Sequence, residues 1–184
     1  MMPVKFVATC LTAGQMDSCQ SLGVDIIGNY ARSYGEIVPG CVTDFTVHCF
    51  NSAALTVLRD LGVKRATLHP ELNLAQIRDI KKCIDTELVV YGKIPLMKLG
   101  NPAINGTVTD RTGTKFFIKD DNLYNSVPVF MADKMNDIEK SGVTHARFIF
   151  TTEAANEVNT VIKAYMHKKA LDIEFTRGKF YKTV

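Results

Sequence analysis

Three segments of the chain repeat one local pattern, in which a glycine ends a helix-like stretch and leads directly into a short apolar run. The glycines are Gly23, Gly62 and Gly142, and each is followed by a valine. A glycine just past the end of a helix adopts the left-handed backbone conformation that other residues avoid, so each copy indicates a helix-to-strand junction. The glycines are 39 and 80 residues apart, which fits two strand–helix units in every interval of about 40 residues. Such alternation predicts a parallel sheet with helices on its outside.

The segments between these junctions continue the alternation. Runs of β-branched and aromatic residues predict strands, listed here by number: 4–9, a short strand within 24–28, 41–49, a strand ending at 67–68, 87–91, 129–131 and 145–150. Helical spacing of apolar residues and capping side chains predict helices at 52–61, 74–83, 132–140 and 153–168, with Asn51 or Ser52 capping the first and Asn73 the second. The segment 171–184 is expected to be extended.

Turn-forming residues interrupt this rhythm between residues 100 and 122. We expect a β-hairpin excursion there, with 107–109 pairing with 115–118. No G-x-G-x-x-G or P-loop motif occurs, which removes the usual nucleotide-binding reasons for an open doubly wound sheet. The predicted fold is therefore a single α/β domain over residues 1–184, a parallel (β/α) barrel-like structure that is partial or compact. About seven strands can be placed, fewer than the eight of a full barrel, so open strand edges predict a homo-dimer or a partner subunit.

Composition excludes several other classes of protein. Hydrophobic residues make up 46% and charged residues 22%, and the net charge is only +3, which excludes a disordered chain. No window approaches the 18 or so uncharged apolar residues of a membrane span, and the N-terminus lacks the apolar core of a signal peptide. The five cysteines have no C-x-x-C spacing, so we expect reduced thiols in a cytoplasmic protein and no metal site built from them. The sequence identifies no cofactor.

Ligands of parallel α/β folds meet the chain at the carboxyl ends of the strands. The set His69-Pro70-Glu71 follows one expected strand, and its imidazole and carboxylate could share a proton or a metal ion. We therefore predict His69 and Glu71 as catalytic residues. The alternative is that Glu71 lies near the next helix N-terminus and His69 forms a local hydrogen bond.

Four further residues are predicted to bind substrate. Asn51, Tyr91 and Lys93 follow expected strands, and Arg177 lies in the C-terminal segment. Lys93 and Arg177 would hold an anionic group of a peptide or small-molecule substrate. Six Lys/Arg with interleaved aromatic residues near the C-terminus would allow RNA binding, the alternative being a solvated helix end followed by a packed strand.

Several motifs resemble one known family. They are Asp44-Phe45-Thr46-Val47-His48-Cys49-Phe50-Asn51-Ser52, the run from Leu61 to Ile77 around Leu68-His69-Pro70-Glu71-Leu72, Glu87-Leu88-Val89-Val90-Tyr91-Gly92-Lys93-Ile94-Pro95-Leu96-Met97, Asp110-Arg111-Thr112-Gly113, Asn125-Ser126-Val127-Pro128, Met131-Ala132-Asp133 and Phe175-Thr176-Arg177-Gly178-Lys179-Phe180-Tyr181. Together they resemble the C-terminal portion of the collagenase-like peptidases, family thirty-two among peptidases of unknown mechanism, from about Gly23 onward.

The resemblance implies a peptidase domain or fragment. The family's signature, a Glu followed by paired cysteines, has no counterpart here, so we expect the chain to be incomplete alone. One alternative that the resemblance implies is a subdomain of an iron–sulfur-dependent hydroxylase of RNA or of a quinone precursor. The other is a non-catalytic interaction or scaffold remnant.

Overall fold

The computed structural model describes residues 3–100 and 105–182. The main-sheet strands are β1 (Lys5–Thr9), β2 (Asp25–Ile26), β3 (Val42–Thr43), β4 (Arg65–Thr67), β5 (Asp85–Gly92), β10 (Val129–Phe130) and β11 (His145–Ile149). A smaller sheet contains β6 (Pro95–Lys98), β7 (Gly106–Thr109), β8 (Lys115–Lys119) and β9 (Asn122–Tyr124). The helices are α1 (Ala13–Ser21), α2 (Ser52–Asp60), α3 (Leu74–Asp79), α4 (Met135–Lys140) and α5 (Ala155–Met166), with 3₁₀ turns η1 (Tyr34–Glu36), η2 (Phe45–Val47) and η3 (Ala132–Lys134).

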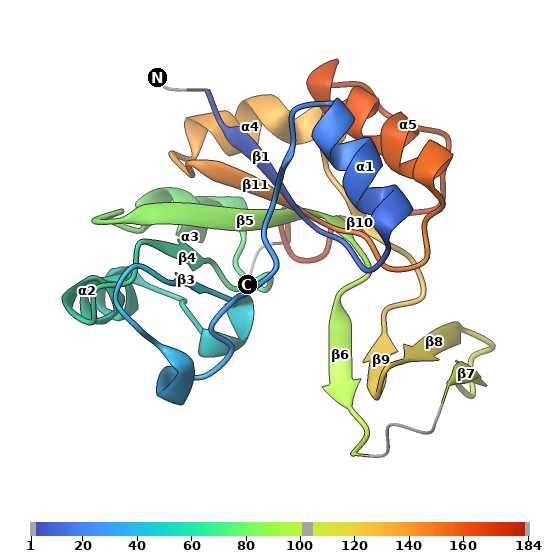
Figure 1. Ribbon diagram of the computed structural model, residues 1–184, viewed down its shortest axis with the longest axis horizontal. Coiled ribbons are helices and arrows are strands. Elements are labelled where there is room, and N and C mark those ends of the chain that lie inside the picture. Colours follow the sequence, from blue (N-terminus) through green and yellow to red (C-terminus); the bar gives the residue numbers. More distant parts are fainter. Residues whose placement is uncertain (1–2, 101–104, 183–184) are drawn as a thin grey trace.

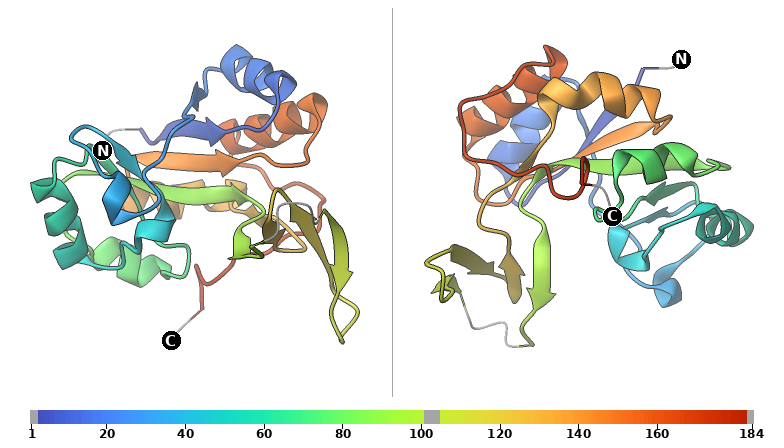
Figure 2. Two further views of the ribbon diagram at one scale, coloured as in Figure 1. Left: turned by 60° about the horizontal axis from the view of Figure 1, so that its bottom comes forward. Right: turned by 180° about the vertical axis from the view of Figure 1, so that it is seen from behind.

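The main sheet is parallel, as the glycine junctions predict. Its strand order is β2-β1-β11-β5-β4-β3, and each of these neighbours is parallel, while β10 adds an antiparallel pairing at the end of β5. The sheet curls into a half-barrel with helices outside (Figures 1 and 2). The predicted α/β barrel-like class is confirmed.

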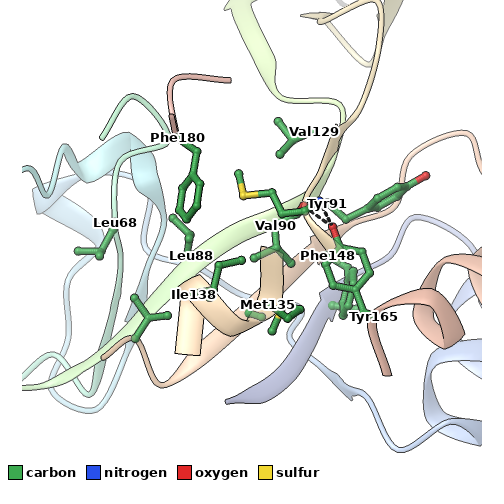
Figure 3. Packing of buried hydrophobic residues seen from close by; sticks show 14 of the residues in the cluster. Leu68, Leu88, Val90, Tyr91, Val129, Met135, Ile138, Phe148, Tyr165 and Phe180 are labelled. Atoms are coloured by element: carbon green, nitrogen blue, oxygen red, sulfur yellow. Dashed lines mark hydrogen bonds between the residues drawn. The ribbon is translucent and has the colours of Figure 1, made fainter. Parts of the chain in front are cut away.

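Alternating residues of the central strands bury an apolar layer under the helices. Figure 3 shows side chains of β5 and β11 packed against α4 and α5, namely Leu88, Val90, Phe148, Met135, Ile138 and Tyr165. These six are at most 2% exposed, and burial of each such side chain stabilises the fold by about 1.5–3 kcal/mol. The Tyr165 hydroxyl donates to Val90 O (2.5 Å) and accepts from Met131 N–H (2.7 Å). The helix-side core therefore fixes β5 against the segment that follows β10.

The three junction glycines adopt the backbone conformation that the sequence predicts. Gly23, Gly62 and Gly142 have φ angles of 72°, 80° and 81°. At Gly62 an added Cβ would also lie 3.2 Å from Pro39, so the turn there is closely packed as well as left-handed.

One short segment spans both edges of the curled sheet. At one edge, Asp25 and Ile26 pair with β1, and Ile27 N–H donates to Ala8 O. At the other edge, Ala31 N–H donates to Val42 O, and Asp44 N–H donates to Ala31 O. Residues 25–31 thus pair with the outer side of β1 and, through Ala31, with the outer side of β3, while β2 is the last strand on its side of the described sheet. The expected homo-dimer or partner subunit stays a prediction.

The excursion is larger than the sequence indicates. The predicted hairpin is confirmed, with Thr107 opposite Phe117 and Thr109 opposite Lys115. Strand β9 pairs with β8 and β6 pairs with β9, so a four-stranded antiparallel sheet of order β6-β9-β8-β7 projects from the half-barrel (Figure 1). The predicted Asn-Pro turn at 101–102 lies outside the described residues.

Two sequence-based boundaries are wrong. Residues 41–49 do not form one strand, because β3 ends at Thr43 and the Asp44 carboxylate accepts from Phe45 N–H, which starts the η2 turn. His48 ends that turn with a left-handed φ of 58°. Helix α3 ends at Asp79 rather than at residue 83, and Ile80 is already extended.

Candidate functional site

A cavity of ≈ 480 Å³ lies where β4 and β5 end and the small sheet begins. Residues that follow β4 form one wall, residues that lead into β6 form another, and the C-terminal segment closes a third. The lining residues are Phe45, Thr46, His48, His69, Pro70, Glu71, Ile94, Pro95, Leu96, Asn125, Val129, Thr176, Gly178 and Lys179. The position agrees with the general location of ligands at the carboxyl ends of parallel strands.

Two histidines and a phenylalanine stack along this cavity. The His69 ring lies 4.1 Å from the Phe50 ring and 5.3 Å from the His48 ring, measured between centroids. The left-handed backbone at His48 is uncommon for a residue other than glycine, and such conformations concentrate at functional sites. The η2 turn thus places the His48 ring against the His69 ring. The sequence did not predict this pairing.

His69 is held in one hydrogen-bonding arrangement. The Glu71 backbone N–H donates to its Nδ1 (3.3 Å), so the neutral ring carries its proton on Nε2. Within residues 3–100 and 105–182, Nε2 itself has no hydrogen-bond partner. Burial and then the neighbouring His48 lower the pKa of His69, which outweighs the opposite effect of Glu71. At neutral pH the ring is an uncharged donor facing a cavity.

The Glu71 carboxylate is the acidic group of the cavity. Its Oε2 lies 3.5 Å from Lys179 Nζ, and both side chains are more than half exposed. The X-Pro-Glu turn after β4 positions this carboxylate, and the C-terminal segment supplies the lysine. The structure thus brings both predicted catalytic residues, His69 and Glu71, into one cavity.

The four predicted substrate-binding residues lie elsewhere and make structural contacts. Asn51 caps α2, since its Oδ1 accepts from Ala54 N–H (2.9 Å). Lys93 lies over the Phe117 ring, 5.3 Å from its centroid. Arg177 forms an ion pair with Asp133 (2.7 Å) and donates to Phe130 O (2.6 Å), so it fastens the C-terminal segment to the η3 turn.

Tyr91 is buried in the helix-side core. The pairing of β5 with β11 shifts register, so that Arg147 lies opposite Val89 but Phe148 lies opposite Tyr91. The shift directs the Tyr91 ring toward aromatic neighbours (Figure 3), and its hydroxyl donates to Glu153 Oε1 (3.2 Å). Substrate binding by Asn51, Tyr91, Lys93 and Arg177 stays a prediction, and the structure does not group these side chains with His69.

Sequence reasoning missed a buried polar network on the inner face of the half-barrel. Glu87 Oε2 lies 3.0 Å from Arg65 Nε, and Arg147 Nη1 lies 2.8 Å from Asp44 Oδ1. The hydroxyls of Tyr30 (3.0 Å) and Thr67 (2.9 Å) donate to Glu87 Oε1. Two arginines and two carboxylates balance in charge, and all are less than 9% exposed. Polar side chains at alternate strand positions, Arg65 and Thr67 or His145 and Arg147, were the signal available in the sequence.

A second cavity of ≈ 180 Å³ adjoins the first and reaches this network. The two cavities share Phe45, Thr46 and Pro95. Arg32, Asp44 and Arg147 line the second, so a bound molecule that extends past His69 would meet these charged side chains.

The described residues do not fit a metal centre or an iron–sulfur cluster. Across 3–100 and 105–182, no three His, Cys, Asp or Glu side chains are grouped so as to hold a metal ion. Cys10 and Cys19 are neighbours, with their sulfurs 3.6 Å apart, and no third cysteine joins them. In the same part of the chain no helix has the length and apolar character to cross a membrane.

Comparison with protein families agrees with this arrangement. The model of peptidase family U32 matches residues 42–179, three quarters of the chain, including the whole cavity lining. The chain belongs to peptidase family U32. The U32 match begins after β1, α1 and β2, which carry the strand pairings that close the half-barrel. No curated protein and no solved structure matches the chain.

Proposed function

We propose that this U32 domain binds a peptide in the cavity beside His69 and hydrolyses it there. The observation that carries the proposal is the convergence of an uncharged imidazole donor and a carboxylate on one cavity at the strand ends. Both groups come from the three-residue turn after β4. Membership of a peptidase family supports the peptide as substrate class.

The arrangement divides the chemistry between two residues. The Nε2–H of His69 hydrogen-bonds the peptide carbonyl oxygen and stabilises the negative charge that develops on it. The Glu71 carboxylate takes a proton from a water molecule, which attacks the carbonyl carbon. The C–N bond then breaks, and the proton passes from Glu71 to the leaving amine. Lys179 keeps the Glu71 carboxylate oriented through their ion pair.

The edge of the small sheet supports an extended ligand. Strand β6 is the first strand of that sheet and pairs with β9 on one side only in the described part of the chain. Pro95 and Leu96 of β6 line the cavity, and Leu96 is 52% exposed. A peptide can add to such an edge as a further strand, with side chains entering the apolar part of the cavity.

The sequence left two alternatives to a peptidase, an iron–sulfur-dependent hydroxylase and a non-catalytic interaction or scaffold role, and their support differs. No group of cysteines favours an iron–sulfur-dependent hydroxylase. A non-catalytic binding or scaffold role is favoured by the structural contacts of Asn51, Tyr91 and Arg177. The same cavity would then bind a peptide without cleaving it.

A cleavage assay separates these functions. The purified chain is incubated with a defined set of peptides, with and without divalent cations, and products are identified by mass spectrometry. We expect cleavage by the unchanged chain, a loss of 100-fold or more in Glu71→Gln, and full activity in the matched control Asp17→Asn, an exposed carboxylate of α1. Binding without cleavage would support the scaffold role, and neither binding nor cleavage would contradict both.

A further inference from the structure

Two cysteines at the start of the chain lie against each other. Cys10 follows β1, and Cys19 lies near the end of α1, and their sulfurs are 3.6 Å apart. An S–S bond is ~2.05 Å long, so a combined movement of about 1.5 Å would join them. No other cysteine lies with them in the described residues. Both precede the U32 match, which begins at residue 42, so the proposed peptide site does not account for this pair.

The two thiols differ in their access to solvent. Cys19 is fully buried, whereas Cys10 is only half-buried. The loop after Cys10 is open, with Leu11 45% exposed, and it is anchored through Gln15, whose Oε1 accepts from Leu11 N–H (2.9 Å). Cys10 is therefore the thiol of the pair that a small reagent can reach from solvent.

The pKa values of the two thiols also differ, chiefly because of the hydrogen bond between them. The hydrogen bond with Cys19 lowers the pKa of the Cys10 thiol, against the opposite effects of burial and of Glu153. The same hydrogen bond, together with burial, raises the pKa of Cys19. The more accessible thiol of the pair is therefore the one that loses its proton more readily, and the thiolate is the form that reacts with oxidants.

We propose that Cys10 and Cys19 are a redox-active dithiol that hydrogen peroxide converts to an intramolecular disulfide. The Cys10 thiolate attacks one peroxide oxygen, the O–O bond breaks, and the departing hydroxide takes a proton to become water. Cys10 is then a sulfenic acid. The Cys19 thiol then attacks that sulfur and gives up its proton, the S–O bond breaks, and the departing hydroxide takes up a proton to form a second water. In sum, two thiols and one peroxide give one disulfide and two waters.

The disulfide has a structural consequence at the second cavity. Thr9 and Leu11, on either side of Cys10, both line the cavity that contains Arg147. Closing the bond draws this loop toward α1, so the shape of that cavity depends on the oxidation state of the pair.

Mass spectrometry tests the proposal without reference to any catalytic activity. The protein is treated with hydrogen peroxide, free thiols are alkylated under denaturing conditions, and trypsin is added. Trypsin releases both cysteines in one peptide, residues 6–32, because no Lys or Arg lies between Lys5 and Arg32. We expect this peptide to resist alkylation, to be lighter by two hydrogen atoms, and to regain both alkylation sites after treatment with dithiothreitol.

Two variants provide the controls. In Cys19→Ser the disulfide cannot form, so peroxide should leave a sulfenic acid at Cys10 that dimedone traps. In Cys83→Ser, which removes an exposed cysteine outside the pair, the peptide should behave as in the unchanged chain. Full alkylation of Cys10 and Cys19 after a peroxide dose that oxidises Cys83 would overturn the proposal. So would a disulfide that joins Cys10 to another chain.

Discussion

Glu87 and Arg65 form an ion pair on the inner face of the half-barrel, with Oε2 and Nε 3.0 Å apart and the Glu87 side chain fully buried. Arg147 lies 3.8 Å from the other carboxylate oxygen and stacks on the Tyr30 ring at 3.7 Å. Tyr30 belongs to the segment that spans both edges of the sheet. The buried charged network therefore connects β4, β5 and β11 with the segment that pairs at both ends of the half-barrel sheet.

Replacing Glu87 should destabilise the fold strongly. Glu87→Gln keeps the acceptor for Tyr30 and Thr67 but leaves two buried guanidinium groups with Asp44 alone. Loss of one partner from a buried ion pair costs about 3–5 kcal/mol of unfolding free energy, which urea denaturation can measure. The exposed pair of Arg59 and Asp60 provides the control, because Asp60→Asn should leave the midpoint unchanged. A change below about 1 kcal/mol for Glu87→Gln would show that the network is not needed for stability.

Gly92 should tolerate no side chain. An added Cβ would lie 2.2 Å from the Ile149 carbonyl oxygen, and the φ of +124° is itself open only to glycine. Gly92→Ala should therefore cost roughly 3 kcal/mol or more. Gly28→Ala, where a Cβ would meet nothing within 4 Å, should stay within about 0.5 kcal/mol. Equal thermal midpoints for the two variants would contradict this account of the β5–β11 pairing.

His145 should make stability depend on pH below neutrality. Burial, followed by the charge of Arg65, lowers the pKa of this ring from 6.5 to about 4. The His145 ring therefore binds a proton near pH 6.5 in the unfolded chain but only near pH 4 in the folded chain. The stabilisation is complete above pH 6.5 and is lost as pH falls toward 4, by roughly 3 kcal/mol. His145→Asn should show a smaller loss of urea stability between pH 7 and pH 4.5 than the unchanged chain; equal losses would refute the assignment.

His48 should control the protonation of His69. The two rings stack 5.3 Å apart, and the charge of His48 helps to lower the pKa of His69. In His48→Gln the His69 pKa should therefore rise toward its ordinary value, and the acid limb of any peptide cleavage should move to higher pH. An NMR titration of the ring protons measures the first effect directly. An unchanged His69 titration would show that His48 does not contribute to lowering the His69 pKa.

The sequence predicted those parts of the fold that depend on local pattern. Gly23, Gly62 and Gly142 locate the helix-to-strand turns because only a left-handed residue ends a helix in this way. Asn51 and Asn73 cap the helices that follow them because a side-chain acceptor satisfies a free N–H. The family's motifs likewise indicated the peptidase resemblance.

Features that depend on contacts distant in sequence could not be predicted. The register shift that buries Tyr91 arises between β5 and β11. Arg177 lies near the end of the chain yet pairs with Asp133, 44 residues earlier, a contact that no local pattern indicates. The closure by residues 25–31 requires both edges of a sheet whose strand order only the structure reveals.

The most direct test of the central claim is a peptide titration followed by the ring signals of the four histidines. If the cavity at the strand ends binds the peptide, His69 and His48 should shift as peptide is added. His145 on the inner face and His167 at the end of α5 should not move. The same titration of Glu71→Gln should still shift His69, which separates binding from cleavage. Peptide binding that leaves His69 and His48 unmoved would contradict the account.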